Sequence, residues 1–165
     1  MKCWMMFVAV LLCAMPAAAA NRCYSPDEVN AEQWLRLHSE LMVITVTCHQ
    51  SSTGQDLVAA YTGFTKSNIT TLHDAEQTLT AYYKKAYGGQ GVDRLDRLRT
   101  LLANEIGQQA ANVSSPAFCA QRRDKVIALR NAGLPVLEGE VGRLRAAART
   151  LEPACSDKVR TANKG

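Results

Sequence analysis

Apolar residues gather between Trp34 and Cys48, and their spacing predicts a helix. Successive members of the pattern fall three and four residues apart, the spacing that places side chains on one side of a helix. The apolar positions of this stretch are Trp34, Leu35, Leu37, Leu41, Met42, Ile44, Val46 and Cys48. Because this stripe is wider than a lone surface helix needs, we expect a central helix against which the other helices pack.

The start of this helix is marked by Ser25-Pro26-Asp27-Glu28. This order places a serine at the N-cap, a proline at the first helical position and a glutamate at the third, which is the pattern of a capping box. The helical pattern continues to about His49. The polar residues from Gln50 to Gly54 then predict a turn.

A second helical region runs from Asp56 to Tyr87 and is interrupted between Lys66 and Thr71. We expect a short helix followed by a longer one, with Ser67-Asn68 as the cap of the second. Gly88-Gly89 is expected to end it, because glycine readily adopts the conformation that a helix C-cap requires.

A third helical region spans Gly91–Ala111, and the connector Asn112-Val113-Ser114 follows it. Ser115-Pro116 starts the last region with the same cap chemistry as the first helix. That region continues almost to the end of the chain, but Pro135 predicts either two helices or one bent helix. The apolar face of the third region is formed by Val92, Leu95, Leu98, Leu102 and Ile106. The last region carries a stripe of Cys119, Val126, Leu129, Leu137, Val141, Leu144, Ala148 and Leu151.

The first twenty residues have the features of a secretory signal peptide. Lys2 supplies a positive start, an apolar run follows from Trp4 to Ala14, and small residues lead to a cleavage point after Ala20. We therefore divide the chain into a signal peptide at 1–20, a helical bundle domain at 21–151 and a polar C-terminal tail at 152–165, the last anchored only at Cys155. This division predicts a periplasmic or secreted protein that does not span the membrane.

Four cysteines remain after the signal peptide, and in an exported chain they suggest two disulfides with three possible connectivities. No stretch shows the two-residue alternation of a strand, so we expect an all-α fold, an up-and-down bundle of four to six helices. If the last region bends at Pro135 without reversing, Cys48 and Cys119 meet at one end of the bundle, and Cys23 and Cys155 meet at the other. The predicted pairs are therefore Cys48–Cys119 and Cys23–Cys155. A reversal at Pro135 would break the second pair.

The charge is unevenly distributed along the chain. Residues 21–90 contain 5 basic and 7 acidic side chains, whereas residues 91–165 contain 13 and 8. A basic second half could favour an anionic partner surface, but the acidic residues among the arginines make a solvated helix exterior the better interpretation. We expect no nucleic-acid partner. The possible interaction surface comprises Tyr83, Lys84, Lys85, Arg94, Arg97, Arg122 and Arg123, with Tyr83 exposed, because Tyr82 and Tyr83 point about 100° apart on a helix.

Few residues occur in a pattern that indicates a metal site or a catalytic site. His38 and Met42 are four apart and, together with His49 and His73, could present ligands to a soft metal, but core packing accounts for them better. Glu40 and Glu105 could be partly buried carboxylates of a hydrolase. We expect instead that both pair with arginines at the margin of an apolar stripe. No catalytic residue, metal or cofactor is predicted.

Several short segments resemble those of short, exported, helical proteins of unassigned role from Gram-negative bacteria, alphaproteobacteria especially. These segments are Glu40-Leu41-Met42 leading to Cys48, Tyr61-Thr62-Gly63-Phe64, Ala81-Tyr82-Tyr83, Leu102-Ala103-Asn104-Glu105 and Phe118-Cys119-Ala120. The resemblance covers residues 34–120. It implies a periplasmic helical domain with a Cys48–Cys119 bridge and brings no catalytic residue or ligand.

These observations favour a small protein of the cell envelope that acts by binding an envelope protein or polymer, without catalysis. An envelope inhibitor or immunity-type protein directed against a secreted enzyme is the first alternative. A cell-wall or ester hydrolase that uses Glu40 or Glu105 is the second.

Overall fold

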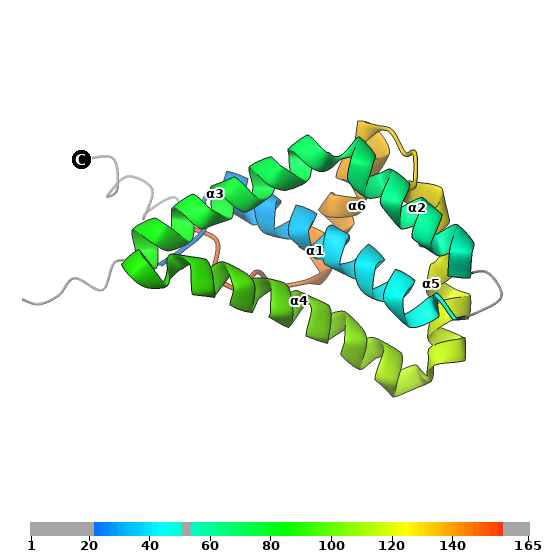
Figure 1. Cartoon of the computed structure of the whole chain (residues 1–165). Coiled ribbons are helices and arrows are strands. Elements are labelled where there is room, and N and C mark those ends of the chain that lie inside the picture. Colours follow the sequence, from blue (N-terminus) through cyan, green and yellow to red (C-terminus); the bar gives the residue numbers. More distant parts are fainter. Residues whose placement is uncertain (1–21, 51–53, 157–165) are drawn as a thin grey trace, which may run out of the picture.

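A computed structural model describes residues 22–50 and 54–156. The predicted signal peptide, residues 1–20, lies outside this part of the chain. The described residues form six α-helices and one short 3-10 helix (Figure 1). The helices are α1 (Pro26–Cys48), α2 (Gly54–Ser67), α3 (Ile69–Tyr87), η1 (Gly88–Gln90), α4 (Gly91–Val113), α5 (Ser115–Leu129) and α6 (Leu134–Ala147). None of these helices has the length and apolar character needed to cross a membrane.

The capping box predicted at the start of α1 is confirmed. The Ser25 side chain accepts a hydrogen bond from the backbone N–H of Glu28, and the Glu28 carboxylate accepts one from the backbone N–H of Ser25 at 2.6 Å. Pro26 occupies the first helical turn, where its missing N–H costs no hydrogen bond. The sequence therefore defines the first residue of α1 through its own cap.

Helix α1 is the axis of the molecule, as its apolar stripe predicted. It contacts every other α-helix, from α2 to α6, and Figure 1 shows it running through the middle of the fold. Nearly all of its side chains between Ala31 and Cys48 are buried or half-buried. Several of the buried side chains are polar or charged: Glu32, Gln33, Arg36, Ser39, Glu40 and Thr45.

The helices alternate in direction, and the two disulfides close the bundle at opposite ends. Helices α2 and α3 return along α1, α4 runs outward again, and α5 and α6 together lead the chain back (Figure 1). Cys48 is bonded to Cys119 and Cys23 to Cys155, across 71 and 132 residues of sequence. Both predicted pairs are confirmed, and the last region forms two helices that are separated at residues 130–133, with Pro135 in the first turn of α6. Loops of this length correspond to roughly 4–5 kcal/mol of stabilisation per bridge in the chain-entropy account.

Two predicted caps are wrong. Asn68 stands between α2 and α3, but its side chain donates to the carbonyl of Phe64 at 2.8 Å and does not cap α3. The last region starts one residue earlier than predicted, with Ser114 at the N-cap in a left-handed conformation and without a capping hydrogen bond. The expected connector 112–114 is reduced to Ser114, because α4 continues to Val113. At Asn68 the contact with Phe64 therefore replaces the side-chain cap.

The core follows the predicted apolar faces, with exceptions at their ends. The α4 positions Leu95, Leu98, Leu102 and Ile106 are buried, whereas Val92 is 53% exposed. Val92 lies in the first turn of α4. Leu151 is also exposed, because the helix predicted to carry it ends at Ala147.

Helices α3 and α4 meet at a tight turn. Gly88 ends α3 with a positive φ, as predicted for this glycine pair. Gly91 opens α4 against the backbone of α3, where an added Cβ atom would lie 2.7 Å from the backbone nitrogen of Lys84. A residue without a side chain is required for this close approach.

The C-terminal segment is held by more than its cysteine, which corrects the prediction for the tail. The backbone N–H of Tyr24 donates to the carbonyl of Pro153, and the backbone N–H of Cys155 donates to the carbonyl of Tyr24, both at 2.8 Å. The hydroxyl of Tyr87 donates to the carboxylate of Glu152. Segment 148–156 therefore packs against the start of α1 and forms part of the structure around it.

Candidate functional site

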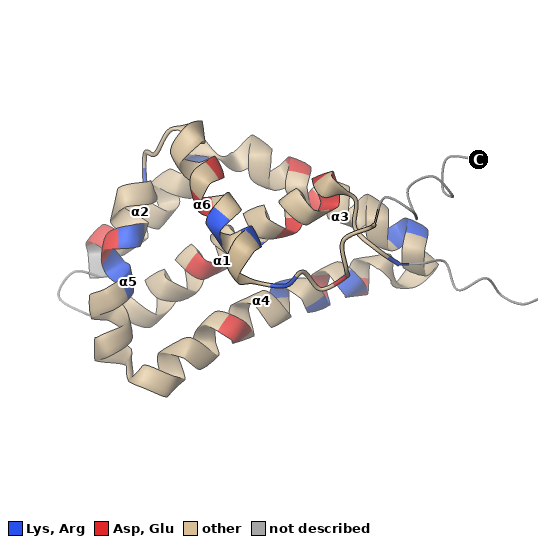
Figure 2. Cartoon of the chain, turned by 180° about the vertical axis from the view of Figure 1, so that it is seen from behind, with Lys and Arg blue, Asp and Glu red and all other residues tan. Residues whose placement is uncertain are grey.

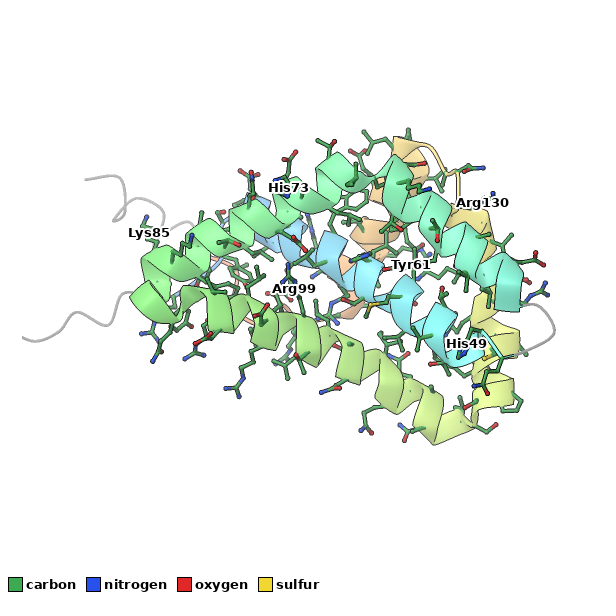
Figure 3. The ribbon with its side chains drawn as sticks, in the orientation of Figure 1. His49, Tyr61, His73, Lys85, Arg99 and Arg130 are labelled. Carbon is green, nitrogen blue, oxygen red and sulfur yellow. A yellow bond between two sulfur atoms is a disulfide. The ribbon has the colours of Figure 1, made fainter. Side chains whose placement is uncertain are left out.

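The predicted interaction surface does not form one patch. Lys84 and Lys85 end α3, and Arg94 and Arg97 lie in the first turns of α4, so these four gather at one end of the molecule. The predicted arginines of α5 lie at the other end. Figure 2 shows Lys and Arg residues at both ends, and Figure 3 places Lys85 far from α5. The sequence prediction joined two separate groups, because it had no information on how far apart the helices would lie.

Tyr83 is fully buried, which contradicts its predicted exposure. Its hydroxyl lies 2.5 Å from the hydroxyl of Tyr24, and the ring of Tyr82 lies 4.7 Å from the ring of Tyr24. The segment before α1 covers the end of α3, so directions about 100° apart on that helix are both enclosed. Burial raises the pKa of Tyr24 and Tyr82 above the ordinary value and that of Tyr83 to about 12.

The basic residues of α5 include an internal group that holds α5 and α6 to α1. Arg122 pairs with the buried Glu40 at 3.0 Å, and Lys125 pairs with the same carboxylate at 2.7 Å. Lys125 also pairs with Glu140 of α6. Burial lowers the pKa of Lys125, and its hydrogen bond to Glu40 opposes that shift. Arg123, by contrast, lies 3.9 Å from the carboxylate of its neighbour Asp124.

The second carboxylate considered for a hydrolase, Glu105, also has a basic partner. It pairs with Arg36 at 2.5 Å, and Arg36 approaches Glu32 on the next turn of α1 at 3.6 Å. The Glu32 carboxylate accepts from the backbone N–H of Leu151 at 3.0 Å, and burial raises its pKa. Both predicted pairings of glutamate with arginine are confirmed, although Glu40 is buried and does not lie at a margin. These contacts attach other elements to α1.

The structure brings His38 and His73 to one hollow between α1, α2 and α3, whereas His49 does not line it. His38 Nε2 lies 2.7 Å from the hydroxyl of Tyr61, whose ring stacks on the imidazole, and burial lowers the pKa of His38. His73 is exposed on α3 and approaches Gln77, and His49 lies at the end of α1 (Figure 3). Within residues 22–50 and 54–156, no group of three His, Cys, Asp or Glu side chains could hold a metal ion.

A hollow of about 530 Å³ lies where α1, the end of α6 and the segment after α6 meet. We call it the Gln33 pocket. Figure 2 shows these elements on the side where α6 crosses α1. Its lining comprises Val29, Gln33, Arg145, Ala148, Arg149, Thr150, Leu151, Pro153 and Ala154. The volume lies within the range of small-molecule sites.

Gln33 is the unusual member of this lining. Its side chain is completely buried, yet among the described residues neither its amide nitrogen nor its amide oxygen has a hydrogen-bond partner. Buried amides almost always find partners, because leaving one unsatisfied costs about 1–3 kcal/mol. Both atoms are shielded from water, so the fold leaves one donor and one acceptor unsatisfied beneath the wall of the pocket.

The electrostatic character of the pocket is positive. Arg145 and Arg149 are its charged residues, and within the described chain no Asp or Glu contributes to the lining. Arg145 donates to the side-chain oxygen of Asn30 at 2.9 Å. Arg149 receives a hydrogen bond from Arg36 at its backbone carbonyl, which positions the residue while its guanidinium remains exposed. The hydroxyl of Thr150 donates to the carbonyl of Glu152 at 2.6 Å.

Sequence reasoning missed this site. Gln33 lies four residues before Leu37 and eight before Leu41, so it continues the apolar stripe of α1 in the direction of the N-terminus. A polar residue in line with a core stripe was the available signal. The other half of the pocket comes from segment 148–154, which was predicted as helix and tail.

Comparisons of the chain with protein-family models, with curated proteins and with solved structures find no match.

Proposed function

We propose that this protein is exported to the cell envelope and acts there by binding a small ligand in the Gln33 pocket, without catalysis. The observation that carries the proposal is the buried, unpartnered amide of Gln33 beneath the wall of a hollow of about 530 Å³. A ligand that satisfied this amide would remove a cost that the fold otherwise bears.

The lining of the pocket supports binding over catalysis. It supplies one amide, two guanidinium groups and an apolar wall, which together can orient a ligand. Its one hydroxyl, that of Thr150, is engaged with a backbone carbonyl. His38, Glu40 and Glu105 lie outside the lining and contact other residues of the chain.

Export is supported by the N-terminal sequence and by the disulfides. Residues 1–20 have the pattern of a cleavable signal, and two disulfides join the four cysteines that follow it. Disulfides persist in the periplasm and outside the cell, where thiols are not kept reduced. A stapled bundle would also hold the two halves of the pocket in register.

The test expresses the full chain in a Gram-negative host and recovers the mature protein from the periplasm. Mass spectrometry is expected to find Asn21 as the first residue and both disulfides formed. Native mass spectrometry then follows incubation with the low-molecular-weight fraction of an envelope extract.

We expect a bound mass on the wild-type protein and on the surface control Gln108→Leu, but not on Gln33→Leu. Equal retention by all three proteins, or a ligand converted to product during incubation, would contradict the proposal.

A further inference from the structure

The lining of the Gln33 pocket also defines what kind of molecule fits it. The side chains of Gln33 and Arg149 come from different elements, α1 and the segment after α6, and both contribute to one hollow. A ligand that uses both must carry a group for the amide and an anion for the guanidinium.

The amide of Gln33 is covered in this structure, so a ligand reaches its N–H donor and its carbonyl acceptor only when the side chains over it move. A peptide-type amide in a ligand presents the complementary pair, an oxygen that accepts and an N–H that donates. A simple anion satisfies only the donor. Complete satisfaction of Gln33 therefore favours a ligand with an amide bond.

The rim of the pocket carries positive charge. Arg149 is exposed, has no acidic partner among the described residues and lies at the rim of the pocket, where Arg145 adds a second positive charge. Guanidinium groups bind carboxylates through paired hydrogen bonds. Arg145 lies in the last turn of α6 and Arg149 just after the helix, and cations are favourable at this negative end of any helix. The charges alone would not indicate a ligand, and the inference rests on their combination with Gln33.

The apolar part of the lining sets the size of the remaining group. Val29, Ala148, Leu151 and Pro153 surround the polar positions with small or medium apolar side chains. This wall suits methyl-sized substituents near the amide better than a large or charged body.

From this combination we propose that the Gln33 pocket binds a small molecule in which a free carboxylate follows an amide bond: an N-acylated amino acid or the carboxyl end of a short peptide. Gln33 pairs with the amide, Arg149 binds the carboxylate, and the apolar wall receives the small side chain. This inference rests on the proposed function and specifies its ligand.

The test is calorimetric titration of the mature, disulfide-bonded protein with N-acetyl-alanyl-alanine and, separately, with N-acetyl-alanine. Two compounds serve as controls: acetate, and N-acetyl-alanyl-alaninamide, in which the C-terminal carboxylate of the dipeptide is capped as an amide. We expect the capped dipeptide and acetate to bind at least about tenfold more weakly than N-acetyl-alanyl-alanine, because each lacks one of the two paired groups. Tighter binding of the dipeptide than of N-acetyl-alanine indicates a peptide terminus, and equal binding indicates an acyl amino acid.

Variants locate the binding. We expect Arg149→Gln to bind N-acetyl-alanyl-alanine about tenfold more weakly than the wild type and to bind N-acetyl-alanyl-alaninamide equally well. Gln33→Leu is expected to bind both dipeptides more weakly. The matched control Arg97→Gln, on the exposed side of α4, binds like the wild type. Equal affinity for the free and capped dipeptides, or an unchanged Arg149→Gln, would overturn the assignment of the carboxylate. If no probe binds while the extract ligand still requires Gln33, the ligand class is wrong and the binding function stands. If Gln33→Leu retains the extract ligand as well, both are wrong.

Discussion

The pair of cations around Glu40 allows a quantitative prediction for Glu40→Gln. The Glu40 side chain is 3% exposed and accepts from Arg122 at 3.0 Å and Lys125 at 2.7 Å. Removing one partner of a fully buried ion pair costs about 3–5 kcal/mol, because the other charge is left unsatisfied. Here the side chains of Arg122 and Lys125 are 34% and 21% exposed. Both can regain some hydration, so we expect a loss of about 2–3 kcal/mol in the free energy of unfolding.

Urea unfolding followed by far-UV circular dichroism, with both disulfides intact, measures this loss. Glu138→Gln is the matched control, because Glu138 is exposed on α6, and surface substitutions usually change stability by less than about 0.5 kcal/mol. Adding Arg122→Met to Glu40→Gln should recover part of the loss, because Arg122 then has no acidic partner among the described residues, whereas Lys125 keeps Glu140. A loss for Glu40→Gln no greater than that of the control would refute the view that this network holds α5 and α6 to α1.

Three further predictions test separate parts of the fold. Gly91→Ala should lower the free energy of unfolding by about 1–3 kcal/mol, because the added methyl group overpacks against the α3 backbone. Gly89→Ala should leave it nearly unchanged, because nothing lies within 4 Å of an added Cβ. Urea unfolding of both variants measures the difference. Burial raises the pKa of Tyr24, Tyr82 and Tyr83, so above pH 10 the unfolded chain releases protons that the folded chain retains. The free energy of unfolding should therefore fall as the pH rises above 10. In Tyr82→Phe, one proton fewer is released on unfolding, so the free energy should fall less steeply with pH. Gln33→Leu should raise the free energy of unfolding by about 1 kcal/mol or more, because it removes an unsatisfied amide; a loss of stability measured by urea would show that the amide has a structural partner.

The bundle could be predicted because its determinants are local. The capping box at Ser25 and the glycines after Tyr87 specify helix ends through their own backbone chemistry. The disulfide pairs then followed from counting helix directions, which needs only the number of reversals. A local signal failed where another hydrogen-bond acceptor was available: the Asn68 side chain donates to the carbonyl of Phe64 and does not cap α3.

The candidate site could not be predicted in the same way, because it depends on what covers each helix face. Tyr83 is buried by a segment about sixty residues away in sequence, and no pattern within α3 reports that cover. The Gln33 pocket similarly requires segment 148–154 to lie against α1, which follows from hydrogen bonds such as that between Leu151 and Glu32. The position of Gln33 within an apolar stripe was visible, but its lack of a partner was not.

The most direct test of binding at Gln33 observes its side-chain amide. In ¹⁵N-labelled mature protein, the two amide proton signals that disappear in Gln33→Leu identify this group by NMR. We predict that N-acetyl-alanyl-alanine shifts these two signals in a saturable manner and leaves those of exposed glutamines such as Gln108 in place. Unchanged Gln33 signals at probe concentrations that shift other residues would contradict the assignment of this amide as the centre of the site.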